Sequence, residues 1–345
     1  MEQVSMNKMF NSRYLLILIL MISFGSLNGC GKQKADIERP SIDSTGIIPP
    51  PGNNSLPSLK GKLLYHRYKN YGDESKMYIY DFASRQLTCI SDGWNLHDPM
   101  NGDFSPDGKY IVFMAQAAAE QKWDIFLYEV GSGGKPINLT GGDGNRNEDP
   151  KFSQDGKSIC FKSTSPQSAA NLFIMDLHGN ISQQVTNNNI ESGMPYFVPG
   201  GKMMLYARGA GASSDIYRVN IDGTNNIPIE KESNLQEYYP IAIDSASYLF
   251  TRWYSTSNKN DQVYAGYLSG RSAVRLPFNS PDANYSDPFP FGKEYVFLSG
   301  TKNGTVGGYD LYIANTSSGQ IWSLSSFEKQ INTTENELGT CYYPE

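Results

Sequence analysis

Histidine is the side chain best suited to acid–base or metal chemistry near neutral pH, and this chain has three, His66, His97 and His178. No two stand at the spacing of a metal-binding pair, although His66 and His97 could approach each other through neighbouring units of a fold. No Gly-x-Ser-x-Gly nucleophile motif occurs, and the nearest segment, 209–213, is typical of a flexible loop. We therefore expect no metal site and no cofactor, and we favour a function other than catalysis.

Three of the four cysteines, Cys89, Cys160 and Cys341, lie far apart inside segments that we predict to be strands. An odd number of separated cysteines does not form a disulfide framework, and a nucleophilic cysteine would need a base that the sequence does not place beside it. We therefore expect buried free thiols.

The fourth cysteine, Cys30, ends a segment with the order of a lipoprotein signal peptide. Lys8 and Arg13 precede an apolar run of about eleven residues, 14–24, which is too short to span a bilayer. The following Leu-Asn-Gly-Cys at 27–30 resembles the bacterial lipobox, which implies cleavage after residue 29 and lipidation of Cys30. An ordinary secretory peptide is the alternative. Gly31 resembles the sorting pattern of outer-membrane lipoproteins, so we expect a lipid-anchored protein of the cell envelope, with its periplasmic or surface side left open.

The composition of the remaining residues indicates a tether followed by a folded domain. Residues 30–58 are polar and rich in proline, which is typical of a semi-extended tether, and we assign the folded domain to residues 59–345. The 29 Lys and Arg residues against 35 Asp and Glu give a net charge of −6, which disfavours nucleic acid as a partner. With 33 Gly, 19 Pro and no long helical pattern, the domain should consist of short strands joined by turns.

A repeat predicts how these strands are arranged. The segment 104–113 begins Phe-Ser-Pro-Asp-Gly-Lys and continues as an apolar strand, and the segments 152–161 and 197–206 are variants that begin Phe-Ser-Gln-Asp-Gly-Lys and Phe-Val-Pro-Gly-Gly-Lys. A preceding proline recurs at Pro99, Pro150, Pro195, Pro240, Pro288 and Pro344. Intervals near 45 residues are typical of propeller blades, and six segments with alternating large side chains follow the apolar strands. We therefore predict an all-β, six-bladed β-propeller of four-stranded blades.

The first blade lacks an inner strand with this signature, and the C-terminal segment 340–344 matches the start of a repeat with nothing after it. We expect this segment to join blade one and to close the ring, because open end blades would expose unpaired strand edges.

The Phe-Ser-Pro-Asp-Gly-Lys copies, followed by Asp-Ile-x-x-Tyr, resemble the repeats of the TolB-type β-propeller family over roughly residues 61–345. TolB has an α/β domain before its propeller, whereas this chain has the lipobox and tether there. The resemblance implies a WD-like recognition or scaffold module. The repeats are also similar to the propeller half of prolyl-oligopeptidase-like enzymes, whose catalytic domain we do not expect in this chain, and to oligogalacturonate lyase, whose histidine cluster we cannot match.

Propeller topology places the loops that enter each blade and the loops between its second and third strands on one face of the ring. We expect ligand contacts there from aromatic, acidic and arginine side chains: Tyr71, Trp94, His97, Glu148, Glu191, Arg208, Glu237, Tyr238, Arg252, Trp253, Tyr254 and Tyr285. The favoured hypothesis is a monomeric, membrane-anchored, non-enzymatic module that binds an envelope protein or a glycan. The alternative is a carbohydrate-active enzyme of the lyase type, with acidic or tyrosine residues acting at the channel mouth.

Overall fold

The structure is a computed structural model that describes residues 56–345 except 71–73, 118–121, 233 and 303. The chain divides into two units, Met1–Gly52 and Asn53–Glu345, and only the second contains described residues. The predicted signal peptide, Cys30, most of the tether and Tyr71 therefore lie outside the described part of the chain.

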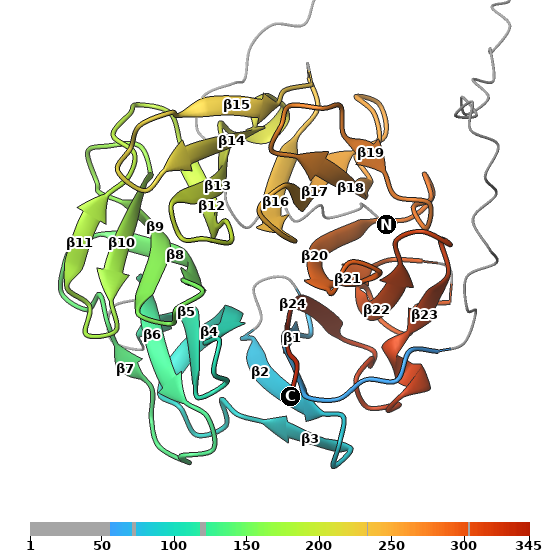
Figure 1. The fold of residues 1–345 in the computed structure, drawn as a ribbon. Helices are drawn as coiled ribbons and strands as arrows, with labels where there is room; N and C mark the ends of the chain where they lie inside the picture. The colour runs from blue at the N-terminus through green and yellow to red at the C-terminus, as the bar shows by residue number, and fades with distance from the viewer. Residues whose placement is uncertain (1–55, 71–73, 118–121, 233, 303) are drawn as a thin grey trace, which may run out of the picture. The chain divides into compact units, whose positions relative to one another are not determined.

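Six antiparallel sheets of four strands stand in a ring around a central channel (Figure 1). In each blade the first strand named lies beside the channel and the last lies at the outer edge. Blade 1 contains β24 (Asn336–Tyr343), β1 (Lys62–Tyr68), β2 (Lys76–Asp81) and β3 (Gln86–Cys89). Blade 2 contains β4 (Leu96–Phe104), β5 (Tyr110–Ala117), β6 (Trp123–Glu129) and β7 (Ile137–Asn138). Blade 3 contains β8 (Arg146–Phe152), β9 (Ser158–Thr164), β10 (Asn171–Asp176) and β11 (Ile181–Gln184).

The remaining three blades have the same order of strands. Blade 4 contains β12 (Ser192–Phe197), β13 (Met203–Arg208), β14 (Asp215–Asn220) and β15 (Ile227–Glu230). Blade 5 contains β16 (Glu237–Ala242), β17 (Ser247–Trp253), β18 (Asp261–Tyr267) and β19 (Val274–Arg275). Blade 6 contains β20 (Tyr285–Phe291), β21 (Tyr295–Gly300), β22 (Asp310–Asn315) and β23 (Ile321–Ser323). Among the residues that the structure describes, two 3₁₀ helices, Gly211–Ser213 and Leu324–Ser326, lie in connections. The predicted all-β, six-bladed propeller is confirmed.

The ring closes as the sequence predicts. Strand β24, the last of the chain, pairs antiparallel with β1 from Lys62 opposite Tyr343 to Tyr68 opposite Asn336. In Figure 1 the red C-terminal strand lies beside the blue strand that begins the domain. Blade 1 is thus built from both ends of the domain, and no separate N-terminal inner strand is needed.

The repeated Phe-Ser-Pro-Asp-Gly segment is a hairpin turn whose side chains bond to its own backbone. In blade 2 the Ser105 hydroxyl donates to Asp107 Oδ1 at 2.7 Å and accepts from the Tyr110 amide at 2.9 Å. Gly108 adopts φ +69°, a left-handed conformation that glycine enters without a Cβ penalty. The equivalent Gly156 of blade 3 has the same φ of +69°. This turn chemistry explains why the motif recurs between inner and second strands.

Each inner strand has a bulge at a common position, and β4 of blade 2 has a second one. A residue with positive φ, between 50° and 67°, occupies the same position in every inner strand: Asn101, Asp149, Met194, Tyr239, Asp287 and Gly339. Strand β4 has a second such residue, Asp98, with φ 52°. At each of these positions the pairing register with the second strand shifts. Proline follows this position in blades 3 to 6, but Gly102 and Thr340 follow it in blades 2 and 1, and Pro99 follows the additional bulge of blade 2 at Asp98. Pro99 and Pro344 are therefore not equivalent to the other four prolines, which corrects the sequence-based alignment of the repeat.

The core consists of the layers between blades. In one such layer Leu64 and Met77 of blade 1 pack with Phe104 and Ile111 of blade 2, and all four are buried. Cys341 lies in the same cluster. Cys160 and Cys341 are buried free thiols, as predicted, whereas Cys89 is free but only half-buried. Burial raises the pKa of the Cys160 and Cys341 thiols, so these groups stay protonated and unreactive.

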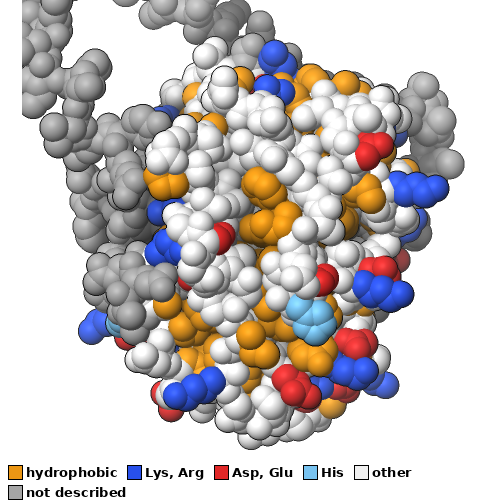
Figure 2. Space-filling view, turned by 90° about the vertical axis from the view of Figure 1, so that its left-hand side faces the viewer, with side chains coloured by type: hydrophobic (Ala, Val, Ile, Leu, Met, Phe, Trp, Pro, Cys, Tyr) orange, Lys and Arg blue, Asp and Glu red, His pale blue; other side chains and the backbone are white. Residues whose placement is uncertain are grey.

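Hydrophobic side chains on the outer side of the ring form small groups separated by polar and charged ones (Figure 2). The exposed aliphatic residues include the first residue of the outer strand in four successive blades: Ile137, Ile181, Ile227 and Val274.

Candidate functional site

One face of the ring carries the starts of the inner strands and the ends of the second strands, and we call it the mouth face. All the candidate ligand-binding residues that the structure describes lie on this side of their blades, because they stand at or next to these strand ends. The fold therefore gathers them on one face, as expected from propeller topology. Their exposure differs greatly.

Six candidates are buried: Glu148, Glu237, Tyr238, Arg252, Trp253 and Tyr285. Glu237 has no exposed surface and Trp253 only 3%. These side chains hold the blades together in this structure and present no surface to a ligand. Their part in binding would be to position exposed neighbours.

The other described candidates reach solvent. His97 is exposed, and Tyr254 is 40% exposed with the Arg275 guanidinium 5.0 Å from its ring centre. Trp94 and Arg208 are half-buried. The side chain of Glu191 is 44% exposed. The exposed part of the mouth face is thus formed by single aromatic and charged groups separated by buried ones.

A buried ion-pair network fixes the mouth face at blade 3. The Lys162 ammonium lies 2.9 Å from Glu148 Oε2, 3.6 Å from Glu191 Oε1 and 4.0 Å from Asp149 Oδ2. Arg146 adds a second cation 2.6 Å from Glu148 Oε1. Burial raises the pKa of Glu148, but the two cations together outweigh this effect and lower the pKa to about 2. Glu148 is therefore an ionised structural carboxylate and not a general acid near neutral pH.

A second buried group of charges, Arg252, Glu237 and Glu230, lies between blades 4 and 5. Arg252 donates from Nε to Glu237 Oε1 at 2.7 Å, and its Nη2 lies 2.9 Å from Glu230 Oε2. Its guanidinium is stacked 4.6 Å from the ring centre of Tyr264. Burial outweighs the attraction of Arg252 and raises the pKa of Glu237 to about 7. Both partners are buried, so neither is free to act on a substrate in this structure.

Aspartates beside the channel connect neighbouring blades at three of the six junctions. Asp103 Oδ2 of blade 2 accepts from the Phe152 amide of blade 3 at 2.8 Å. Asp149 accepts from the Met194 amide at 3.3 Å, and Asp287 accepts from the Gly339 amide at 3.4 Å. Burial raises the pKa of all three carboxyl groups. These hydrogen bonds give the channel aspartates a structural role.

The channel itself contains a cavity of about 50 Å³, lined by bulge residues of blades 2 to 6 and by Gly339 of blade 1. That volume holds little more than a water molecule. No group of three or more His, Cys, Asp or Glu side chains placed to bind a metal occurs among the described residues.

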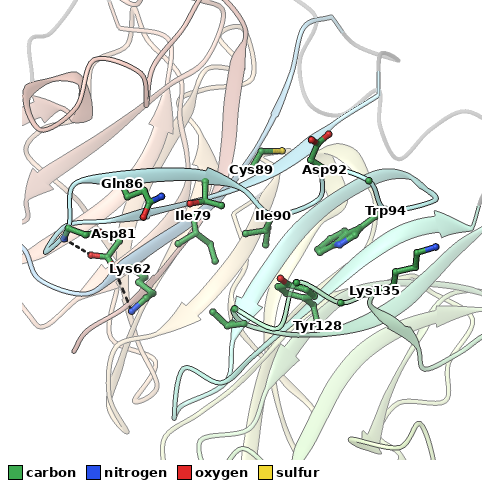
Figure 3. A pocket seen from close by; sticks show the side chains of 17 residues that line it. Lys62, Ile79, Asp81, Gln86, Cys89, Ile90, Asp92, Trp94, Tyr128 and Lys135 are labelled. Atoms are coloured by element: carbon green, nitrogen blue, oxygen red, sulfur yellow. Dashed lines mark hydrogen bonds and ion pairs between the residues drawn. The ribbon is translucent and has the colours of Figure 1, made fainter.

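A larger groove, which the sequence did not predict, runs between blades 1 and 2 along the outer strand β3 (Figure 3). Its volume is about 540 Å³, within the range of ligand pockets. Ile79 and Ile90 lie at its centre, the Lys62–Asp81 pair at one end, and Trp94 beside Lys135 at the other. Trp94 stacks on Phe113 with ring centres 5.1 Å apart. Trp94 therefore borders this groove, and the glycine-rich turn 131–134 that forms one wall is the sequence signal for it.

Asp261 is a buried titratable residue that sequence reasoning missed. It begins β18 opposite Trp253 and is 3% exposed. Burial raises its pKa to about 7, and the nearby charge of Asp287 adds to the rise, while the Tyr238 hydroxyl acts against it. Nothing in the sequence around Asp261 distinguishes it from an exposed aspartate at the start of a strand.

This carboxyl predicts a pH dependence of stability. Between about pH 4 and pH 7 the folded protein keeps a proton on Asp261 that the unfolded chain, with its ordinary pKa of 3.8, has lost. Stability from this group is therefore present below pH 4 and lost as pH rises through 7, by up to about 4 kcal/mol. Urea unfolding of wild type and Asp261→Asn at several pH values should show their free-energy difference changing across this window. Asp92→Asn, an exposed control, should show no such change, and a flat difference for Asp261→Asn would contradict the buried-carboxyl account.

Comparisons with known proteins agree with this fold. The family model described as "TolB beta propeller domain" matches residues 51–238, more than half of the chain. A curated relative, "Uncharacterized peptidase YuxL" of Bacillus subtilis (strain 168), is 25% identical over 200 residues. That match covers 56% of this chain and 28% of YuxL, so the chain spans under a third of that relative's length.

Solved structures give the same picture. TolB from Acinetobacter baumannii is similar with a TM-score of 0.65 at 17% identity, over 84% of this chain and 68% of that one. Oligogalacturonate lyase from Vibrio parahaemolyticus is similar with a TM-score of 0.52 at 12% identity, over 76% of this chain and 78% of that one. At these identities the likeness shows the fold alone. Among the described residues, none forms a helix with the length and apolar character needed to cross a membrane.

Proposed function

This chain belongs to the TolB β-propeller domain family, and we propose that it is a non-enzymatic recognition module of the bacterial cell envelope. A lipid on Cys30 anchors it to the outer membrane, and residues 30–58 form the tether to the propeller. The support for the anchor is the charged start, apolar run and lipobox-like ending of residues 1–30. More than one acyl chain would make such anchoring stable.

One observation carries the binding role: the three glutamates predicted for the mouth face, Glu148, Glu191 and Glu237, all form internal ion pairs. Glu148 and Glu237 are both buried against cations, and of the predicted acids only Glu191 reaches solvent. A catalytic site needs convergent groups that can contact a substrate, whereas binding needs only a suitable surface. His97, Tyr254 and Arg208 supply aromatic and cationic contacts of the kind favoured at interfaces.

Cross-linking in living cells with the full-length lipoprotein tests this function. We expect wild type to capture one reproducible envelope partner, and a His97→Ala/Tyr254→Ala variant to lose it, because both side chains are exposed on the mouth face. Ile181→Ala, exposed on the outer strand of blade 3, is the matched control and should keep the partner. Cys30→Ala should move the protein from the membrane fraction to the soluble fraction.

Other outcomes would change the proposal. A partner retained by the double variant would place the binding surface elsewhere. Capture of no partner, together with binding of an envelope polysaccharide, would make the ligand a glycan. Turnover of that polysaccharide, lost in Glu191→Gln, would replace the recognition role with the enzymatic alternative.

A further inference from the structure

Three blades repeat one arrangement near the end of the second strand. An arginine occupies the same register in each: Arg67 in blade 1, Arg208 in blade 4 and Arg252 in blade 5. Each guanidinium lies over a tyrosine ring of the third strand, at 4.4 Å from Tyr78, 5.1 Å from Tyr217 and 4.6 Å from Tyr264. The three sites are therefore equivalent in backbone position and in stacking.

In blades 1 and 5 the residue opposite the arginine on the inner strand is a glutamate. Arg67 lies 2.8 Å from Glu337 and Arg252 lies 2.6 Å from Glu237. Both glutamates are completely buried. A carboxylate from the inner strand thus neutralises the stacked guanidinium in these two blades.

In blade 4 the opposite residue is Ser192, and this carboxylate is missing. Asp215 of β14 stands opposite Arg208 on the other side, but no ion pair within 4.0 Å joins Arg208 to an acidic side chain of the described residues. Arg208 Nε is buried without a hydrogen-bond partner, although the guanidinium also forms a hydrogen bond with the Tyr206 side chain. The remainder of the side chain is half-buried at the mouth face.

An arginine held in place by stacking, partly desolvated and lacking its counter-ion attracts a planar anion strongly, because guanidinium and carboxylate form paired, charge-assisted hydrogen bonds. We propose that Arg208 is the anchor for a carboxylate of the ligand, supplied by an acidic segment of a protein partner. The ligand's carboxylate takes the place that Glu337 and Glu237 occupy in blades 1 and 5. This inference rests on the proposed binding function of the mouth face and names the chemistry of one contact.

The surroundings of Arg208 favour a protein segment over a small ligand. The channel cavity and the groove along β3 are lined by other residues, so Arg208 stands outside both concave sites. Tyr254 follows the end of the second strand in the adjacent blade 5 and is also exposed. An arginine and a tyrosine on neighbouring blades of an open surface match the residues that dominate protein interfaces.

The substitution Ser192→Glu tests this inference, because it introduces in blade 4 the carboxylate that blades 1 and 5 have at the same position. The probe is a fluorescent hexaglutamate peptide, titrated into the purified full-length lipoprotein at low salt. We expect wild type to bind the peptide, and both Ser192→Glu and Arg208→Gln to weaken binding at least tenfold. Ser192→Gln, of the same size but uncharged, should bind like wild type. Thermal unfolding should confirm that all variants fold, with Ser192→Glu no less stable than Ser192→Gln.

The remaining outcomes overturn the inference. Equal binding by wild type, Ser192→Glu and Arg208→Gln would show that Arg208 is not the anchor, and absence of binding to wild type would reject the acidic-peptide site. Binding of trigalacturonate in place of the peptide, lost in the same two variants, would assign the site to a glycan. A partner captured in cells equally by wild type and Arg208→Gln would leave the proposed function standing and reject this contact alone.

Discussion

Deletion of residues 337–345 is expected to destabilise the propeller by more than about 5 kcal/mol, which is the order of the whole stability of many domains. The deletion removes most of β24, the inner strand of blade 1. Leu338 and Cys341 are each 1% exposed, and the Tyr342 ring lies 4.9 Å from both Phe291 and Phe297 of blade 6. Strand β24 therefore completes the sheet of blade 1 and packs it against blade 6. Thermal unfolding of the deletion variant should show a much lower midpoint temperature or no cooperative transition.

Two smaller changes make this prediction specific. Removal of residues 344–345 alone leaves β24 whole and costs only the surface pair between Lys62 and Glu345, so unfolding should change by about 0–1 kcal/mol. Tyr342→Ala should give an intermediate loss of about 3–5 kcal/mol, because it empties a packed aromatic site. An unchanged transition after the longer deletion would contradict closure of the ring through β24.

Much of this fold could be predicted because the sequence has two regular patterns, one within each strand and one from blade to blade. The alternation of apolar residues marks each strand, and the Pro-Asp-Gly turns mark the hairpins at intervals near 45 residues. Blade 1 lacks an inner strand at the start of the domain, and an unmatched strand segment stands at its end. Both edges are paired if the C-terminal segment supplies the missing strand. The bulges were harder to predict, because β4 has two, at Asp98 and Asn101, and Pro99 follows the one that the other blades lack.

The exposure of the candidate site could not be predicted in the same way. Trp253 and Tyr254 are adjacent, yet one is 3% and the other 40% exposed. Successive side chains of a strand point to opposite sides, and at a strand end the sequence does not show which side is covered by the next blade. The sequence therefore locates the face that carries the site but not the atoms on it.

Acidic residues show a second limit of the sequence. Glu148 and Glu237 resemble free carboxylates in the sequence, because their partners Lys162 and Arg252 lie about fifteen residues away on another strand. Cross-strand pairing is set by the register, which depends on the bulge that follows each of these residues. The sequence signal for such an ion pair is a glutamate on an inner strand and a cation near the end of the next strand. This signal identifies a particular pair only when the register of the two strands is known.

Arg252→Met is expected to lower stability by about 3–5 kcal/mol at pH 8, because it leaves Glu237 buried without its cation. The loss should become smaller as pH falls. Burial already raises the pKa of Glu237 to about 7 in the wild type, and without Arg252 the folded-state pKa rises further above the unfolded value of 4.5. A proton is then bound more tightly in the folded state, so stability increases as pH decreases toward 4.5. Urea unfolding at pH 5 and pH 8 measures both effects.

The double variant Arg252→Met/Glu237→Gln separates a structural pair from a ligand contact. If the two side chains serve mainly each other, the double variant should regain part of the stability lost in Arg252→Met, because the buried charge of Glu237 is removed while Glu230 still lacks its cation. It should also lose the pH dependence that Glu237 contributes. Since both groups are buried, the refolded double variant should still capture the partner of the wild type. Loss of that partner from a stable, folded double variant would instead mean that the pair positions the exposed residues of the mouth face, among them the neighbouring Tyr254.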